Sequence, residues 1–335
     1  MKQNTTVRAI DIGYGNTKFV TSAVDKQIEC DLLPSRAPLH SRSAMGGEGA
    51  ISGRRRNVLV EVDGRTYEVG PDTELFKGPP ILHDGYTETA EYLALYRASL
   101  ARMRAPSIDA MITGLPVSQL HEKKSALSRR LMGTHPVPGD RHVDVQSVQV
   151  FAQPLGGLVD HCVLRDGGWR REHNDSVHLL VDPGYYTLDW VVAKGLTEVP
   201  ELSGTYPTGV SNILEFVAKR ISENIGHPVE QFTRLDQGLR RGSVEIRGKT
   251  IDLAHYMKDI GSVWHNALTQ MKNNVGHGGD FDRIYLVGGG ARFLLGELQS
   301  LFPKHPISVA SDSVFANVRG FQAIGHFFLR SLNVA

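Results

Sequence analysis

The stretch Ala9–Val20, AIDIGYGNTKFV, decides the fold class of this chain. Apolar residues flank an acid, two glycines, two small polar residues and a lysine. The apolar runs predict two strands, 6–12 and 17–23, joined by the glycine-rich turn. Glycine has no side chain, so backbone N–H groups can approach an anion closely. The turn is therefore either an ordinary tight hairpin or a binding site for phosphate.

Composition excludes several classes of protein. The 335 residues are enough for two domains, and 41% hydrophobic with 22% charged residues is typical of a globular chain. Lys and Arg (37) nearly balance Asp and Glu (36), which predicts no general affinity for nucleic acid or membranes. Cys30 and Cys162 have no metal-binding or redox spacing. No apolar run is long enough to span a bilayer, and MKQNTTVRAID contains no signal segment. We expect a cytoplasmic protein without direct membrane contact and without direct DNA binding.

Strand-like and helix-like segments alternate along the chain, which predicts an α/β layer architecture. The interval 31–70 is rich in Gly and Pro, and we expect a small irregular subdomain with an Asp-Gly hairpin there. The interval 222–256 is polar and is predicted to be irregular apart from a hairpin at 244–251. Predicted helices are 87–103, 118–132, 211–221, 256–273, 291–301 and 320–332. Further predicted strands are 109–115, 143–151, 178–181, 188–193 and 282–287.

A second turn of the same kind follows much later, in LVDPGYYTLDW (180–190). The pattern Asp11-x-Gly13-x-x-Asn16-Thr17 aligns with Asp182-x-Gly184-x-x-Thr187-x-Asp189. Two hairpins with this spacing predict two related halves. The alternative is a pair of unrelated hairpins, because turns of this composition are common.

A third glycine site, LVGGGA (286–291), favours the first interpretation. A strand that ends in three glycines and leads into a helix suits a nucleobase, ribose or phosphate at the helix N-terminus. The spacing is not that of a dinucleotide-binding fingerprint. An Asp at each first strand repels bare phosphate, so a divalent cation or its water shell is expected between them. Lys18 can offset phosphate charge directly.

In this order, the motifs resemble those of the actin/ParM branch of the superfamily that also holds sugar kinases and heat-shock ATPases. The two turns match its phosphate loops, VQVFAQPLGG (148–157) its first connecting segment, and LVGGGA its adenosine motif. SVFANVRGF (313–321) is similar to the ANxxG stretch of ParM/StbA plasmid-segregation proteins.

The resemblance implies an actin-like (ribonuclease H-like) α/β fold of two related domains around a nucleotide cleft. The domains would be 1–165, with an inserted subdomain at about 32–79, and 166–335, with an insert at about 206–274.

The resemblance also implies the site and its cofactors, ATP and Mg²⁺. Asp11 and Asp182 would hold the metal through water, and Gln153 would orient the attacking water. A helix cap is the other interpretation of Gln153. Asp189 is either a supporting group or only a hairpin residue, and Pro183 removes one N–H donor. The nucleotide-binding residues would be Gly13, Tyr14, Gly15, Asn16, Thr17, Lys18, Gly184, Tyr185, Thr187, Gly288, Gly289 and Gly290.

Three functions remain in competition. The first is a filament-forming cytoskeletal ATPase for plasmid partition, hydrolysing ATP or GTP, with itself and an adaptor protein bound to plasmid DNA as partners. The second is a small-molecule kinase, with Asp84 or Asp109 near the acceptor. The third is a non-filamentous ATP-dependent switch on the same fold.

Overall fold

The computed structural model describes residues 5–24, 27–40, 56–75, 84–165, 167–276 and 281–332. The chain divides into two compact units, Met1–Ser176 with Ala310–Ala335, and Val177–Val309. We call them the first and the second unit. We had expected 166–335 to form one domain, whereas the last part of the chain returns to the first unit.

The first unit is built on a five-stranded sheet with the order β10-β7-β1-β2-β3. β2 pairs antiparallel with β1 and with β3, while β7 pairs parallel with β1 and with β10. The strands are β1 (Val7–Ile12), β2 (Asn16–Val24), β3 (Gln27–Pro34), β7 (Ala110–Leu115) and β10 (Val148–Ala152).

The main sheet of the second unit repeats this plan. Its order is β13-β12-β11-β17-β18, with β14 also paired to β12. β12 is antiparallel to β11 and β13, and β17 is parallel to β11 and β18. The strands are β11 (Val177–Pro183), β12 (Leu188–Lys194), β13 (Thr197–Glu198), β14 (Gly204–Tyr206), β17 (Arg283–Leu286) and β18 (Ile307–Val309). Matching order and direction confirm the two related halves.

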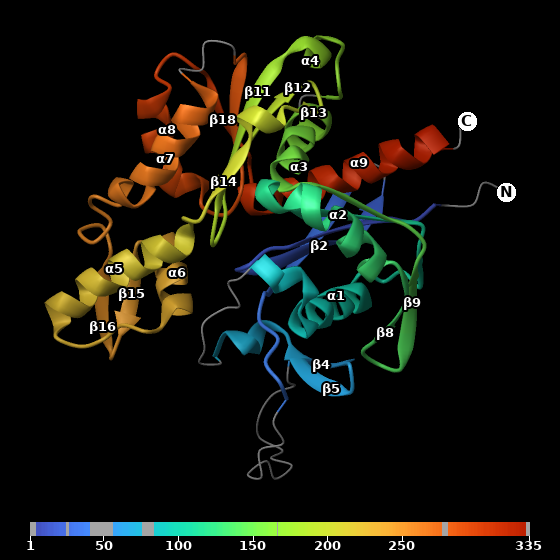
Figure 1. Cartoon of the computed structure of the whole chain (residues 1–335). Helices are drawn as coiled ribbons and strands as arrows, with labels where there is room; N and C mark the ends of the chain where they lie inside the picture. The colour runs from blue at the N-terminus through green and yellow to red at the C-terminus, as the bar shows by residue number, and fades with distance from the viewer. Residues whose placement is uncertain are drawn as a thin grey trace, which may run out of the picture. The chain divides into compact units, whose positions relative to one another are not determined.

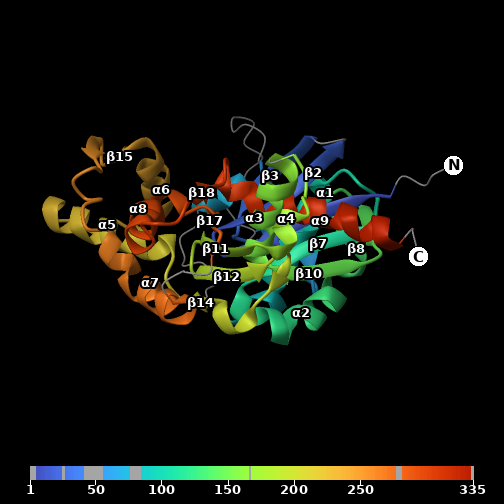
Figure 2. The same ribbon diagram turned by 90° about the horizontal axis from the view of Figure 1, so that it is seen from above.

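Helices cover both faces of the first sheet. On one face, α1 (Ala90–Arg102) begins at Thr89, whose hydroxyl accepts the N–H of Tyr92 at 3.1 Å, and it buries most of its residues in the core. On the other face lies α9 (Ala316–Leu332), whose Val318 and Phe321 pack on Val7 and Ile112. Figures 1 and 2 show the red α9 beside the blue strands of this unit. This apolar contact explains why the end of the chain belongs to the first unit.

The predicted strand 143–151 is two strands in different sheets. β9 (Arg141–Val145) pairs with β6 (Ser107–Ile108) and β8 (Gly133–Val137), whereas β10 joins the main sheet. The chain changes sheets at Ser147, whose hydroxyl donates to Asp109 O at 2.6 Å.

The small elements of the first unit include the predicted Asp-Gly hairpin, β4 (Val58–Val62) and β5 (Arg65–Val69). Asp63 and Gly64 form its turn with φ of 51° and 72°, as such turns require. Arg56, the last residue of a basic run in the sequence, pairs with Asp72 at 2.8 Å, while 54 and 55 lie outside the described residues. The remaining elements are η1 (Pro71–Leu75), η2 (Asp84–Glu88), α2 (Val117–Leu131), α3 (Gln153–Val159), η3 (Asp160–Arg165), α4 (Glu172–Asp175) and η5 (Ser313–Phe315).

The described residues of the second unit form a large apolar core that contains the fully buried Trp190 and Trp264. Its helices are α5 (Val210–Ile225), α6 (Phe232–Arg241), α7 (Gly261–Val275) and α8 (Ala291–Leu301), with η4 (Pro200–Leu202) and the hairpin β15 (Ser243–Ile246) and β16 (Lys249–Asp252). The sequence did not predict α6. Its narrow apolar stripe buries Leu235 and Leu239, and Gly238 lies against Val244. Within the described part of the chain, no helix is both long and apolar enough to cross a membrane.

Candidate functional site

The first glycine turn joins β1 to β2, and Asp11 pairs with Lys18 across the hairpin. The N–H of Gly13 donates to Asn16 O at 3.2 Å, which closes the turn. This N–H is therefore used by the turn itself. A Cβ on Gly13 would come within 3.3 Å of Asn16 O and of Lys18 Nζ, so a side chain at Gly13 would crowd both atoms.

Asp11 brings three of the predicted site residues together. Its carboxylate is buried, with 2% of the residue exposed. Oδ2 accepts a hydrogen bond from Lys18 Nζ at 2.8 Å, and Oδ1 accepts one from Gln153 Nε2 at 2.7 Å. The lysine balances the buried charge, and the amide binds the second oxygen.

Gln153 reaches Asp11 from the point where β10 ends and α3 begins. The N-terminus of α3 has no side-chain cap, and the Gln153 amide is directed to Asp11, so the helix-cap interpretation is wrong. The neighbouring strand makes room for this side chain. A Cβ on Gly114, near the end of β7, would lie 2.8 Å from Gln153 Cγ and 2.6 Å from Phe321 Cζ. Gly114 was not predicted as a site residue.

Two residues that the sequence did not single out support the turn from one side. Ser35 N–H donates to Gly15 O at 3.0 Å, and Ser35 Oγ lies 2.9 Å from Thr17 Oγ1. The ring of Tyr86 stacks on that of Tyr14 with centroids 5.0 Å apart. Burial raises the pKa of Tyr86, which keeps its hydroxyl neutral. Ser35 and Tyr86 lie near opposite ends of the segment between β3 and α1.

The second turn is closed by the same hydrogen bond as the first. Gly184 N–H donates to Thr187 O at 2.8 Å, matching the bond from Gly13 to Asn16. Pro183 lies at the end of β11, and its carbonyl accepts the N–H of Gly290 at 2.9 Å. The missing donor of Pro183 therefore leaves the turn intact.

Asp189 occupies the position in the second hairpin that Lys18 occupies in the first, since it pairs with Asp182. It is 3% exposed and accepts hydrogen bonds from Thr187 Oγ1 at 2.7 Å and from Thr205 Oγ1 at 2.6 Å. Asp189 thus orients the hydroxyl of Thr187, which favours the supporting role. Thr205, from β14, is too far away in sequence to have been predicted.

The triple glycine lies directly against the second turn. Gly288 has a φ of +77°, and a Cβ there would meet Asp182 Oδ1 at 1.9 Å. A Cβ on Gly290 would lie 2.7 Å from Pro183 O. Only residues without side chains fit at these two positions, and α8 begins at the next residue.

The start of α5 is held by the same turn. Val210 N–H donates to Gly184 O at 3.0 Å, and Ser211 N–H donates to Tyr185 O at 2.8 Å. A Cβ on Gly209 would lie 2.4 Å from Tyr185 O, so this residue, which was not predicted, also contributes to the site. The second unit therefore brings the turn, the N-terminal ends of α5 and α8, and Asp182 together.

Comparison with known proteins identifies the family. A family model for the N-terminal domain of actin-like proteins matches residues 9–156, and a model for the C-terminal domain of archaeal, MreB-like actin homologues matches residues 180–300. Together they account for well over half of the chain. The chain belongs to the actin-like proteins. Among curated proteins, none matches the sequence significantly.

Several solved structures have a fold similar to that of this actin-like protein. An archaeal actin homologue, Ta0583, in complex with ADP has a TM-score of 0.75 at 18% identity, over 96% of this chain and 100% of that chain. A 15-stranded ParM filament from Clostridium botulinum has a TM-score of 0.72 at 21% identity, over 97% and 100%. The apo ParM protein of pSK41 has a TM-score of 0.69 at 18% identity, over 99% and 100%. The two-domain actin-like fold expected from the sequence is thereby confirmed.

Proposed function

We propose that this actin-like protein is a Mg²⁺-dependent ATPase that polymerises and drives the segregation of plasmid DNA. The observation that carries the proposal is the contact of Asp11 with both Lys18 and Gln153. It joins a buried acid of β1, a cation of β2 and an amide that follows the end of β10. The equivalent turn of the second unit supplies Asp182, Gly184 and Thr187.

The orientation of Gln153 follows from its hydrogen bond. A carboxylate only accepts, so the NH₂ end of the amide faces Asp11 and Oε1 is the end that can accept a hydrogen bond from water. A neutral amide positions water but is a poor base. We therefore expect slow hydrolysis that depends on the conformation of the protein.

The donor set suits Mg²⁺ held through its water shell. Each oxygen of Asp11 already accepts one hydrogen bond from a protein group, and its remaining lone pair can accept one from a water of the metal's shell. Among the described residues, no three His, Cys, Asp or Glu side chains form a metal cluster. Mg²⁺ typically keeps several waters and uses one or two carboxylates with substrate phosphates, and Asp11 and Asp182 are the two that we assign. When bound, Mg²⁺ neutralises charge on the transferred phosphoryl group.

The glycines and one relative support an adenine nucleotide as the ligand. Backbone around Tyr14, Gly15, Asn16 and Tyr185 would contact phosphate, together with Lys18 and Thr187. Gly288, Gly289 and Gly290 would contact the adenosine. The archaeal homologue Ta0583 has been solved with ADP, which supports an adenine nucleotide here.

Polymerisation and its purpose are inferred from the ParM relatives. A ParM of similar fold forms a 15-stranded filament, and head-to-tail contacts that do not close into a ring produce such polymers. We propose that the partners are further copies of this chain and an adaptor protein bound to plasmid DNA, in the cytoplasm. Hydrolysis would then limit the lifetime of the polymer.

Right-angle light scattering after addition of Mg-ATP tests this function, with phosphate release followed in the same sample. We expect a rise in scattering that decays as phosphate appears, and neither signal in Asp182→Ala. Gln153→Ala should polymerise but release phosphate more slowly. Phosphate release with flat scattering would favour the non-filamentous switch. Phosphate transfer only in the presence of a small-molecule acceptor would favour the kinase.

A further inference from the structure

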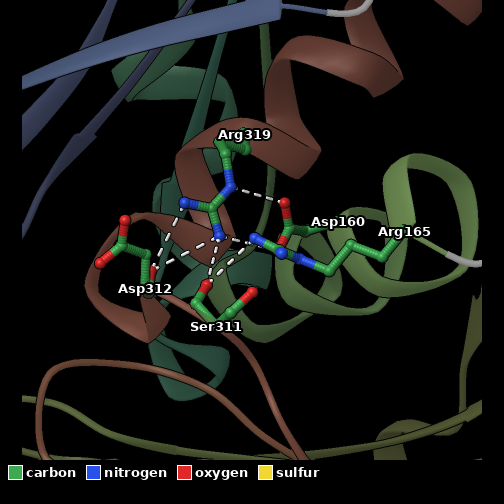
Figure 3. A network of polar contacts seen from close by, with 5 residues as sticks. All are labelled: Asp160, Arg165, Ser311, Asp312 and Arg319. Carbon is green, nitrogen blue, oxygen red and sulfur yellow. Dashed lines mark hydrogen bonds and ion pairs between the residues drawn. The ribbon is translucent and has the colours of Figure 1, made fainter.

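A buried aspartate between two arginines lies at the far end of the helical run that starts with Gln153. Asp160 is fully buried and begins the π-helical turn η3, which continues α3 directly. Arg319 of α9 donates from Nε to Asp160 Oδ1 at 2.7 Å and from Nη2 to Oδ2 at 2.9 Å (Figure 3). Arg165 Nε adds a bond to Oδ2 at 3.2 Å. Burial lowers the pKa of Arg319, but the hydrogen bonds and charge of Asp160 outweigh this effect and raise the pKa overall.

Both arginines also bind the segment where the chain re-enters the first unit, at Ala310. Ser311 O accepts Arg319 Nη2 at 2.9 Å and Arg165 Nη2 at 3.1 Å (Figure 3). Asp312 O also accepts from Arg319, and Asp312 has a φ of 50°. A non-glycine residue in this conformation persists only where its surroundings hold it.

Between its two ends, the helical run packs closely against α9. A Cβ on Gly156 would lie 2.3 Å from Asn317 O, and one on Gly320 would lie 1.7 Å from Gly156 O. The two helices therefore touch backbone to backbone, and Figures 1 and 2 both show them side by side. Asp160 follows Gln153 by seven positions, which is close to two α-helical turns, so both lie on the same face of the run.

We propose that Asp160 and Arg319 are positioning residues for Gln153. They fix the rotation of the run 153–165 against α9 and the re-entry segment, so that the Gln153 amide stays directed to Asp11. Neither residue touches the reacting atoms. The geometric part of this inference stands on the first unit alone, and its consequence for hydrolysis rests on the proposed function.

Hydrogen exchange tests the geometric part without nucleotide. In Arg319→Gln, we expect the backbone amides of 157–160 to exchange about tenfold faster, because the run loses its fixed end. Arg319→Lys should restore part of the protection, since lysine keeps the charge but not the bidentate geometry. The control is Arg102→Gln, which removes another ion pair of the first unit, to Asp31 at 2.9 Å, and should leave 157–160 unchanged. If Arg319→Gln does not fold, Arg165→Gln removes one bond to Asp160 and one to Ser311 O, leaves both bonds from Arg319 to Asp160, and should show the same pattern more weakly.

Hydrolysis kinetics test the consequence. Arg319→Gln should lower kcat about tenfold with KM nearly unchanged, since a small misplacement of a positioned group is costly. Combined with Gln153→Ala, it should add no further loss of kcat. Unchanged exchange at 157–160 in a folded variant, or additive losses of kcat, would overturn the inference. Faster exchange without any wild-type hydrolysis would instead refute the proposed function and leave the positioning role intact.

Discussion

Replacing Gly320 by alanine tests how closely α9 must approach α3. The added Cβ would lie 1.7 Å from Gly156 O, whereas ordinary contact begins near 3.4 Å. Both groups belong to the backbone, so no change of side-chain rotamer relieves the overlap. The helices would have to separate by roughly 1.5 Å to accommodate one methyl group.

The cost of this separation can be estimated from its parts. Inside a helix, alanine is more favourable than glycine by about 1 kcal/mol of stability. Overpacking costs about 1–3 kcal/mol. Separation also weakens the bonds from Arg319 to Asp160, and hydrogen bonds to a charged group contribute about 1.5–3 kcal/mol. We expect Gly320→Ala to lower the free energy of unfolding of the first unit by about 2–4 kcal/mol.

The matched control is Gly296→Ala in α8, where no atom beyond the neighbouring backbone of the same helix lies within 4 Å of the added Cβ. That variant should be more stable than wild type by about 0.5–1 kcal/mol. Calorimetry suits the assay, because two units need not unfold in one step. Trp190 and Trp264 are buried in the second unit, whereas Trp169 belongs to the first, so fluorescence in a Trp169→Phe background identifies the transition of the second unit. A Gly320→Ala variant as stable as wild type would refute the close contact and the restraint on α3 that we derive from it.

Three further perturbations follow from particular contacts. Gly288→Ala places a Cβ 1.9 Å from Asp182 Oδ1 at a φ of +77°. Calorimetric titration with Mg-ADP should therefore show at least about tenfold weaker binding. Unchanged affinity would contradict the glycine site. Lys18→Met leaves the buried Asp11 without its cation and should lower the free energy of unfolding in urea by about 1–3 kcal/mol. Adding Asp11→Asn to the same chain should largely restore this stability. An equally unstable double variant would argue against the pair. Burial lowers the pKa of His135 from 6.5, so the unfolded chain binds the proton more readily than the folded chain. The contribution of neutral His135 to stability is therefore present above pH 6.5 and is lost as the pH falls below it. His135→Gln should therefore lose less stability than wild type between about pH 7.5 and about pH 5.5, and an equal loss in both would disprove this assignment.

The sequence was sufficient to predict the turns, because their signals are local. Spacing around Gly13 and Gly184 predicted two equivalent hairpins, and both close with the same hydrogen bond. The order of motifs also placed Gln153 correctly after a buried strand, although only the structure showed that its amide reaches Asp11.

The rest depends on contacts between distant segments, which no local pattern reports. Gly114 contributes only the absence of a side chain beside Gln153, and Ser35 reaches the turn from a different strand connection, through its backbone N–H and its hydroxyl. Asp160 and Arg319 are 159 residues apart, so their pairing was not predictable. The grouping of the C-terminal helix with the first unit likewise depends on distant residues, since Val318 and Phe321 pack on Val7 and Ile112.

The equivalent turns differ in charge at one matched position, and this difference bears on where a cation is needed. In the first hairpin, Asp11 pairs with Lys18, which neutralises it. In the second hairpin, Asp182 pairs with Asp189, so two buried acids lie on directly opposite residues. Like charges in such positions repel each other.

A divalent cation would therefore stabilise the second unit more than the first. We expect Mg-ADP to raise the unfolding temperature of the second unit more than ADP with EDTA does. Asp189→Asn removes one of the two acids and should reduce that difference, while the same assay on Lys18→Met should preserve it in the second unit. A Mg²⁺ effect that is equal in wild type and Asp189→Asn would show that the paired acids do not create the demand for the cation.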